Sequence, residues 1–388
     1  METVSLRYMV VGGVEQNASI SVTAVNVDLA EREITSVDLS PLQHLPFLEV
    51  LNLYDNHITQ LDLKPLQHCM NFQELNLAEN NLVRLDLSPL ASCKDLQRLV
   101  LHENKLESLN VRGLEQCQKL QILDLERNEL TQVDLSFLKG AAQLLELSLE
   151  GNQLEQLDLT PLHLSANLRE IDLAGNLLKD IDLMPISFCR KLKFLNLSEN
   201  QLTRINLSPL FHLTSIEELD LSRNALTRIQ ISPLRHCRNL LSLSLAGNRL
   251  PFIDLTPLRY CHRLKYLNLS ENPLEELEIS PLLQGQQTFT LNVDARVLLL
   301  ADGKLKEAMW KQPPKSFLPR LKQIRWSGEA PPTSKVTLEQ VDARRLAEGF
   351  AEHCIKMGWL IREGQGTQAK YYVTKEGKEA LRRFGIQV

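Results

Sequence analysis

The sequence predicts an α/β solenoid with a parallel concave β-sheet, followed by a small α+β domain at its C-terminal end. Three observations lead to this prediction. At 388 residues the chain is too long for one ordinary globular core, so several domains or one elongated repeat array is expected. Aromatic residues make up only 5% of a chain that is 43% hydrophobic, which indicates an aliphatic core. One pattern of leucines and asparagines also recurs at a constant spacing.

The repeat begins at Leu48 and reads L-x-x-L-x-L-x-x-N-x-L-x-x-L-D-L-S-P-L-x-x-C-x-x, with a period of 24 residues. An asparagine side chain both donates and accepts hydrogen bonds, so at the bend after each strand it can satisfy backbone groups that would otherwise be buried unpaired. We therefore expect a stacked structural ladder. Its members are Asn56, Asn80, Asn104, Asn128, Asn152, Asn176, Asn200, Asn224, Asn248 and Asn272.

Each repeat contains two short extended segments. The alternation of Leu51 and Leu53 predicts a strand with one buried face, which pairs with the next repeat. In the second half of a repeat, Pro89 suits the first position of a helical turn and Ser88 can cap it. Short helices or 3-10 turns are therefore expected on the convex side.

This pattern resembles the leucine-rich-repeat family, whose unit of 20 to 29 residues carries L-x-x-L-x-L-x-x-N-x-L. The resemblance implies a leucine-rich-repeat horseshoe over residues 24–298, with a degenerate first repeat, ten full repeats and a degenerate last half repeat. Arg32 and Arg296 replace the ladder asparagine in the two degenerate ends, as is typical of caps. Residues 1–23 are expected to form an N-terminal cap hairpin.

The repeat pattern is lost from Ala301, and residues 299–335 are predicted to be a C-terminal cap and basic linker. In residues 336–388, the run G-W-L-I-x(9)-Y-Y-V-T-K-E-G-K-E-A-L-R-R-F-G-I resembles the wing and last helix of prokaryotic winged-helix domains. One long helix stands where that family has a helix-turn-helix, which favours a winged-helix-like module that binds protein. If it binds DNA, the phosphate contacts are expected from Arg344, Arg345, Lys356, Arg362, Lys370, Arg382 and Arg383.

Charge is distributed unevenly along the chain. The formal net charge is −5, but residues 1–303 carry 26 basic and 39 acidic side chains, whereas residues 304–388 carry 17 and 9. Four outward-facing columns of the predicted sheet hold 14 acids and three arginines. Ten strands at about 4.8 Å spacing form a strip on the order of 45 Å long, which is room for a protein domain. An acidic strip repels nucleic acid and accelerates encounter with a basic protein.

The simpler interpretation is that most of these carboxylates only solvate a sheet. Apolar side chains among them favour a binding face, because aromatic residues amid polar neighbours commonly anchor interfaces. Our working hypothesis places a basic partner across the middle of the strip, from Asp124 to Phe194. The predicted protein-binding residues are Tyr54, Val100, His102, Ile122, Asp124, Glu126, Glu146, Glu150, Asp172, Phe194, Asp220 and Tyr266.

Cysteine and histidine columns do not indicate metal or redox chemistry. Six cysteines share one repeat position with Ala141, Ser165 and Leu213, which is typical of a small packing site. The sequence contains no catalytic or cofactor motif. We therefore predict no enzymatic activity, no cofactor, no metal and no small-molecule substrate. The cysteines stand at Cys69, Cys93, Cys117, Cys189, Cys237 and Cys261, and the neighbouring histidines at His44, His68, His212 and His236.

The N-terminus does not resemble a signal peptide, and no stretch is long and apolar enough to span a membrane. Cysteine clusters that seal extracellular repeat proteins are also missing, so a cytoplasmic location without a membrane partner is expected. The predicted function is a protein–protein scaffold or adaptor. In an autoinhibited variant of it, the basic C-terminal part folds back on the acidic strip. The alternative is a transcriptional regulator that binds DNA through its winged helix, the only predicted route to nucleic acid, and senses a protein through its repeats.

Overall fold

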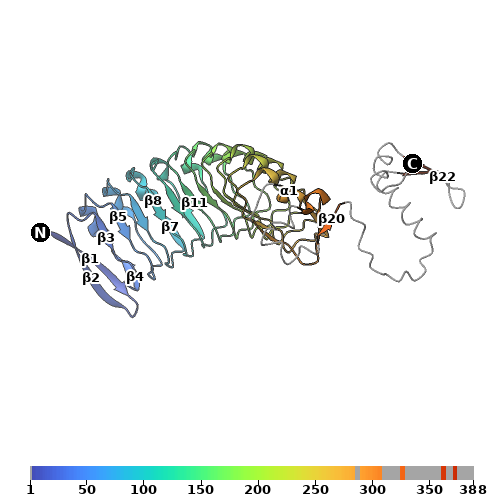
Figure 1. Cartoon of the computed structure of the whole chain (residues 1–388). Coiled ribbons are helices and arrows are strands. Elements are labelled where there is room, and N and C mark those ends of the chain that lie inside the picture. The colour runs from blue at the N-terminus through green and yellow to red at the C-terminus, as the bar shows by residue number, and fades with distance from the viewer. Residues whose placement is uncertain (1, 285–288, 308–323, 328–359, 364–369, 374–388) are drawn as a thin grey trace. The chain divides into compact units, whose positions relative to one another are not determined.

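A computed structural model describes residues 2–284, 289–307, 324–327, 360–363 and 370–373. The chain divides into two compact units, Met1–Glu329 and Ala330–Val388. The first unit is a curved stack of repeats (Figure 1). Within the described ranges, no helix has the length and apolar character needed to cross a membrane.

The N-terminal end of the stack is covered by a hairpin. Strands β1 (Thr3–Val10) and β2 (Val14–Ser21) pair antiparallel, and β1 also pairs with β4 (Ile34–Val37). The turn between β1 and β2 passes through Gly12 and Gly13, both at positive φ, where a side chain is strained. Leucine and tyrosine side chains of β1 are buried in the core, so the hairpin covers the open end of the first repeat.

The concave face is one parallel sheet of twelve strands, in which residues 24 apart lie side by side. Each strand has three residues, because the pattern supplies one central aliphatic residue that is buried between two outward-facing positions. The strands are β3 (Asn26–Asp28), β5 (Val50–Asn52), β6 (Glu74–Asn76), β8 (Arg98–Val100), β10 (Ile122–Asp124), β11 (Glu146–Ser148), β12 (Glu170–Asp172), β13 (Phe194–Asn196), β14 (Glu218–Asp220), β15 (Ser242–Ser244), β16 (Tyr266–Asn268) and β18 (Thr290–Asn292).

The convex side carries ten 3-10 turns and one short α-helix, α1 (Ser280–Leu283), within the described residues. The prediction that Ser88 caps its turn is wrong: the Asp86 carboxylate accepts the Ser88 backbone N–H at 3.0 Å. Ser88 is itself the first residue of the turn, so the side chain two residues earlier has the right reach. The turns are η1 (Ser40–His44), η2 (Lys64–His68), η3 (Ser88–Ser92), η4 (Leu114–Gln116), η5 (Ser136–Leu138), η6 (Thr160–Leu164), η7 (Met184–Phe188), η8 (Ser208–His212), η9 (Ser232–His236) and η10 (Thr256–Tyr260).

All ten ladder asparagines are buried, and each links its own repeat to the preceding one. Asn176 is representative: its Nδ2 donates to the carbonyls of Leu149 and Leu173 at 2.8 and 3.2 Å, and its Oδ1 accepts the Leu154 N–H at 3.1 Å. The ladder is therefore built from asparagine-to-backbone hydrogen bonds between repeats. At the last repeat, the Arg296 guanidinium donates to the Asn272 carbonyl.

The stack continues beyond the point where the sequence pattern ends. Strands β17 (Glu276–Glu278), β19 (Leu298–Ala301) and β20 (Arg325–Trp326) form a second parallel sheet, and the short turn η11 (Gly303–Leu305) lies between β19 and β20 in the chain. The repeat pattern of the sequence ends at Ala301, but the parallel strand pairing continues, because β20 adds one more rung beside β19. A similar pair, β7 (Arg84–Asp86) with β9 (Ser108–Asn110), lies earlier in the chain.

In the second unit, the structure describes one antiparallel hairpin, β21 (Leu360–Glu363) with β22 (Lys370–Val373). This hairpin stands where the sequence predicted two strands around a glycine turn. The helices predicted on either side of it lie outside the described residues. So do most of the proposed DNA-contacting side chains, and the winged-helix resemblance is therefore not shown.

Candidate functional site

The concave face presents the predicted binding residues from the sheet and from the bend that follows it. In each strand the first and third side chains point outward, while the central one is buried. Eight predicted residues lie on these strands: Val100, Ile122, Asp124, Glu146, Asp172, Phe194, Asp220 and Tyr266. The other four follow a strand by two residues: Tyr54, His102, Glu126 and Glu150.

Negative charge is concentrated between β11 and β14, in a group that we call the acidic cluster. Strand register places Glu146 beside Glu170, and Phe194 between Glu170 and Glu218. None of the cluster's carboxylates lies within 4 Å of a basic group among the described residues. The acidic cluster consists of Glu146, Glu150, Glu170, Asp172, Glu218 and Asp220.

Packing within the face opposes ionisation of several of these groups. Burial raises the pKa of Asp172, and the nearby Asp220 charge raises it further, although the Ala174 N–H and the Asn196 side chain both donate to this carboxylate. Burial also raises the pKa of Glu150 and of Glu170, with neighbouring carboxylates adding to the effect. A positive charge placed here would relieve this repulsion.

Two carboxylates just before the acidic cluster, Asp124 and Glu126, are paired within the protein. His102 Nδ1 lies 2.8 Å from Asp124 Oδ2, and Arg127 lies 3.3 Å from Glu126 and 2.7 Å from Glu103. Burial still raises the pKa of Glu126, which Arg127 partly offsets. Of the region from Asp124 to Phe194 in which the hypothesis places a partner, the acidic cluster therefore keeps the carboxylates that lack a basic neighbour within 4 Å among the described residues.

Glu170 and Glu218 were not among the predicted binding residues, although the structure places them in this cluster. Both lie in the first outward position of their strands, the same column as the predicted Glu146. The sequence does show that this column is rich in glutamate, but it does not show which of these carboxylates lack a basic neighbour.

The apolar side chains of the strip differ in exposure. Val100 is only 7% exposed, so the expectation that it offers an outward anchor is wrong. A short branched side chain in the middle of a sheet is covered by the longer residues beside it. Ile122 and Phe194 are half-buried and still reach the surface. Tyr54 donates its hydroxyl to Glu79, and the Tyr266 hydroxyl accepts from Asn292.

A shallow hollow of about 380 Å³ adjoins the acidic cluster on the same face. It contains Asp220 of the cluster, and Tyr266 is among the residues around it. Small side chains line this space, and five of them are serines. The serines are Ser198, Ser222, Ser242, Ser244 and Ser270.

Glycines near this hollow have a structural role that sequence reasoning missed. Gly151, Gly175 and Gly247 take φ of +62 to +64°, and the residues in the same column of other repeats, such as Glu199, are also left-handed. A Cβ on Gly175 would lie 3.3 Å from the Gly151 backbone nitrogen. These glycines therefore allow a left-handed turn and close packing between repeats.

The cysteine column is part of the core. Cys189 Sγ lies 3.6 Å from the Leu162 carbonyl, and burial raises its pKa to about 12, which disfavours a thiolate. The six described cysteines are all buried and free of disulfides. Within the described ranges, no group of three or more histidine, cysteine and acidic side chains is arranged to hold a metal ion.

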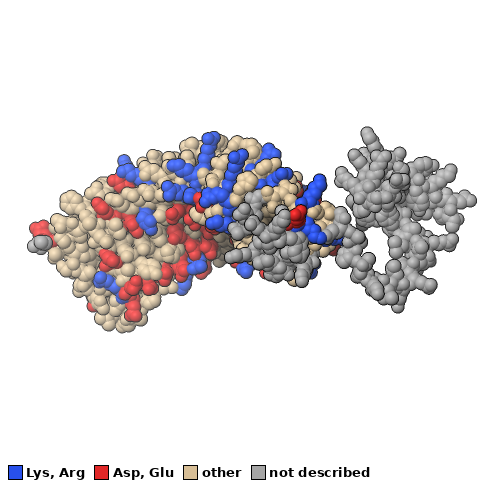
Figure 2. Space-filling model, viewed as in Figure 1, with Lys and Arg blue, Asp and Glu red and all other residues tan. Residues whose placement is uncertain are grey.

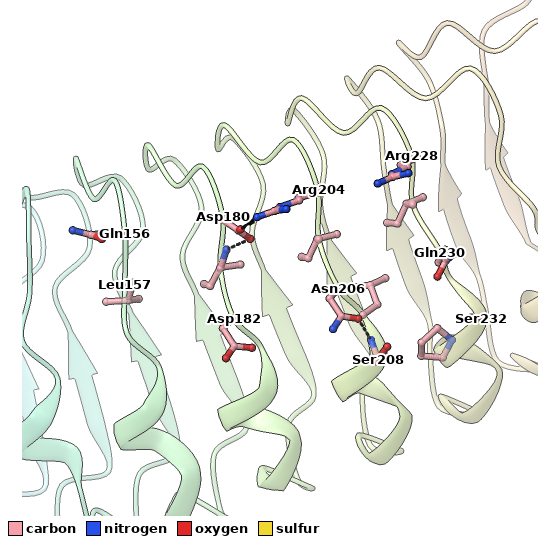
Figure 3. A pocket seen from close by; sticks show the side chains of 15 residues that line it. Gln156, Leu157, Asp180, Asp182, Arg204, Asn206, Ser208, Arg228, Gln230 and Ser232 are labelled. Carbon is pink, nitrogen blue, oxygen red and sulfur yellow. Dashed lines mark hydrogen bonds and ion pairs between the residues drawn. The ribbon is translucent and has the colours of Figure 1, made fainter.

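A larger hollow of about 800 Å³ lies on the flank of the stack (Figure 3). Its polar groups largely satisfy one another: Arg204 pairs with Asp180 at 2.8 Å, and Asn206 accepts the Ser208 N–H at 3.0 Å. The acidic cluster, whose carboxylates have no basic group within 4 Å among the described residues, is therefore the stronger candidate for a binding site.

Comparisons with known proteins agree with this fold. Two family models, both described as leucine rich repeat, match residues 70–130, 118–178, 166–226 and 214–274, and residues 47–69. These matches run from residue 47 to residue 274, which is more than half of the chain. No curated protein matches the sequence.

Solved structures with the same fold come from bacteria and plants. A leucine-rich-repeat protein of Leptospira interrogans is 24% identical, with a TM-score of 0.57 over 72% of this chain and 74% of that one. The functional domain of InlJ from Listeria monocytogenes, which includes a cysteine ladder, is 25% identical, with a TM-score of 0.52 over 73% and 64%. The Arabidopsis thaliana receptor kinase ectodomain GASSHO1/SCHENGEN3, in complex with CASPARIAN STRIP INTEGRITY FACTOR 2, is 23% identical, with a TM-score of 0.58 over 69% and 35%.

Proposed function

Because the chain belongs to the leucine-rich-repeat family, we propose that it is a non-enzymatic scaffold that holds a protein with a basic surface on its concave face. Such repeats generally serve as interaction modules, and the plant ectodomain of this fold was solved in complex with a partner. The observation that carries the proposal is the acidic cluster, six carboxylates without a basic group within 4 Å among the described residues.

Electrostatics and packing support this choice of partner. Asp172, Glu150 and Glu170 have raised pKa values because burial and neighbouring carboxylates disfavour their charged forms. A lysine or arginine from a partner stabilises the charged forms, so binding is coupled to proton release where these groups titrate. Phe194 lies between two carboxylates in strand register and offers an apolar contact at the centre of the cluster.

The serine-lined hollow gives the same partner room for a side chain. It opens beside Asp220, so a long basic side chain that enters it meets a carboxylate and several hydroxyl groups. The planar guanidinium of arginine can donate to both kinds of acceptor at once. We therefore propose an arginine-bearing segment as the part of the partner that contacts β14 to β16.

A fluorescent deca-arginine peptide tests the proposal with the full chain. Replacing Glu150, Glu170 and Asp220 by lysine is expected to weaken binding at least tenfold at low salt, with a smaller effect at high salt. The matched control reverses Glu107, Glu129 and Glu275, which are exposed outside the concave strands and change the net charge equally. Equal weakening in both variants would show a nonspecific charge effect and reject the concave site.

A second proposal concerns residues 336–388. The antiparallel pairing of Leu360 with Val373 supports a wing-like hairpin, and with it a transcriptional regulator that contacts DNA through this unit. Replacing Arg382 and Arg383 by glutamate in the full chain is then expected to abolish binding to a pool of labelled DNA duplexes. Retained duplex binding would reject this function.

We also propose a cytoplasmic location. The support is the column of buried cysteines that form no disulfide among the described residues, a state that a reducing compartment preserves. Thiol alkylation of the protein denatured directly from its native cells is expected to modify all six described cysteines without prior reduction. Modification only after reduction would contradict the proposal.

A further inference from the structure

The edge of the stack that carries the 3-10 turns has the opposite charge in its later repeats. Across residues 160–169, 184–193, 208–217, 232–241 and 256–265 there are nine lysines and arginines and one acid, Glu217. The equivalent segments of the five preceding repeats, beginning at residue 40, hold five basic and three acidic residues. Figure 2 shows lysine and arginine side chains along this edge, with acidic side chains gathered below them.

We call this surface the basic ridge. Lys193 pairs with Glu217 at 2.9 Å, and the other eight basic groups have no carboxylate within 4 Å among the residues that the structure describes. By contrast, Lys119 of the earlier repeats pairs with Asp95 at 2.6 Å. The ridge therefore carries uncompensated positive charge. Its members are Arg169, Arg190, Lys191, Lys193, Arg235, Arg238, Arg259, Arg263 and Lys265.

Aromatic rings stand between these charges and face solvent. Phe188, Phe211 and Tyr260 are 62%, 45% and 46% exposed, and all lie at the ends of the 3-10 turns η7, η8 and η10. The Phe211 and His236 rings are 4.0 Å apart, and the Arg259 guanidinium lies 5.5 Å from the Tyr260 ring centre. The Phe211 ring is thus packed against the next repeat, and the Tyr260 ring against a cation of the ridge.

We propose that the basic ridge binds single-stranded nucleic acid, with its cations along the phosphates and its exposed rings stacked on bases. A single strand carries one charge per nucleotide and unpaired bases, so it matches a surface that alternates cations with aromatic rings over five repeats. A protein partner fits less well, because protein interfaces have cores depleted of charge, whereas this ridge carries basic residues in four of its five segments. The ridge and the acidic cluster are separate surfaces, so this inference does not depend on the proposed protein partner.

Fluorescence anisotropy of the full chain with a labelled 20-nucleotide oligouridine tests the proposal. The variant R190E/R235E/R238E is expected to bind at least tenfold more weakly, with a salt dependence of log Kd that is lower by about 2. The control K94E/R112E/K139E changes the same number of exposed charges on the equivalent earlier segments, and is expected to bind like the wild type. Unchanged affinity in the ridge variant would place nucleic acid elsewhere, including residues 304–388, and overturn the proposal.

A second variant separates stacking from charge. Replacing Phe188, Phe211 and Tyr260 by serine is expected to weaken oligouridine binding several-fold while leaving the salt dependence unchanged. These rings are exposed, so the thermal unfolding midpoint should stay near that of the wild type. Two competitors are compared with oligouridine, a polyglutamate peptide of equal charge and phosphatidylserine vesicles. The proposal is rejected if the peptide or the vesicles bind as tightly as oligouridine, lose binding in the charge variant and keep it in the ring variant. The ridge would then be assigned to an acidic protein or to a membrane.

Discussion

His102 Nδ1 lies 2.8 Å from Asp124 Oδ2, and this pair joins two neighbouring repeats across the concave face. Asp124 was among the residues predicted to bind a partner, but its carboxylate already contacts His102 within the protein. Arg127 engages Glu126 in a similar way at 3.3 Å. The carboxylates of the acidic cluster, between β11 and β14, have no basic group within 4 Å among the described residues.

Replacing His102 by alanine should release Asp124 and extend the acidic surface toward the N-terminal repeats. We expect the deca-arginine peptide to bind about two- to threefold more tightly, while the free energy of unfolding changes by less than about 1 kcal/mol, because the pair is partly exposed. Peptide titration and urea unfolding measure the two effects. The exposed His57 is the control, and equal tightening in its alanine variant would contradict a specific role for the pair.

Replacing Asn176 by alanine should destabilise the stack by about 2 to 3 kcal/mol. The change leaves the Leu149 and Leu173 carbonyls and the Leu154 N–H without their partner in a buried setting. Urea unfolding followed by circular dichroism measures the loss. Thr203, which is exposed in the following repeat, is the control for an alanine substitution. A loss below about 0.5 kcal/mol for Asn176 would show that water replaces the amide.

The acidic cluster should make stability depend on pH. Burial raises the folded-state pKa of Asp172 above its ordinary value of 3.8, and that of Glu150 and Glu170 above 4.5, so the folded state binds protons more tightly than the unfolded chain. As the pH rises from the ordinary pKa values toward and past the raised folded-state pKa values, ionisation of these groups therefore lowers the free energy of unfolding. The variant D172N/E150Q/E170Q is expected to be more stable than the wild type at pH 7, with a difference that shrinks toward pH 4.

Urea midpoints of the two proteins at pH 4, 5.5 and 7 measure this difference. Asp86 is a suitable control, because hydrogen bonds from Ser88 lower its pKa. Its stabilising contribution is present at neutral pH and is lost as the pH falls through the folded pKa, so Asp86→Asn should destabilise at pH 7. A triple variant that is less stable than the wild type at pH 7 would refute the assigned direction.

Replacing Trp326 by alanine should destabilise the C-terminal repeats by about 3 to 5 kcal/mol, because a large ring that is only 3% exposed is removed from the core. Hydrogen exchange read by mass spectrometry locates the effect: protection should fall in β17 and β19 and remain in β5 and β6. Uniform loss along the stack would contradict a local cap. The neighbouring Arg325, which is exposed on β20, is the control position.

Much of the fold follows from sequence because the repeat is local and periodic. Leucines at constant spacing predict a buried aliphatic column. The ten asparagines predict a bend in each repeat, where the amide side chain can form hydrogen bonds with buried backbone groups. The 3-10 turns follow in the same way from proline after a polar residue. The last rung was missed because β20 is joined to β19 by a long segment, and nothing in the periodic pattern marks Ile324 and Trp326 as part of the core.

The candidate sites were only partly predictable. Columns of outward-facing residues can be read from the period, so most of the concave residues were named in advance. Exposure could not be read in this way, as Val100 shows, and neither could the pairing of His102 with Asp124. The basic ridge was missed because its charges come from different columns of four repeats, and each segment alone looks like an ordinary solvated turn.

By itself, the sequence determined the solenoid, its register and the face on which each repeated position lies, because a constant period transmits one local pattern through the whole stack. Only the tertiary structure decided which charges are free. Compensation depends on distances of a few ångströms between side chains of neighbouring repeats, and these distances separate the acidic cluster and the basic ridge from charges that are already paired.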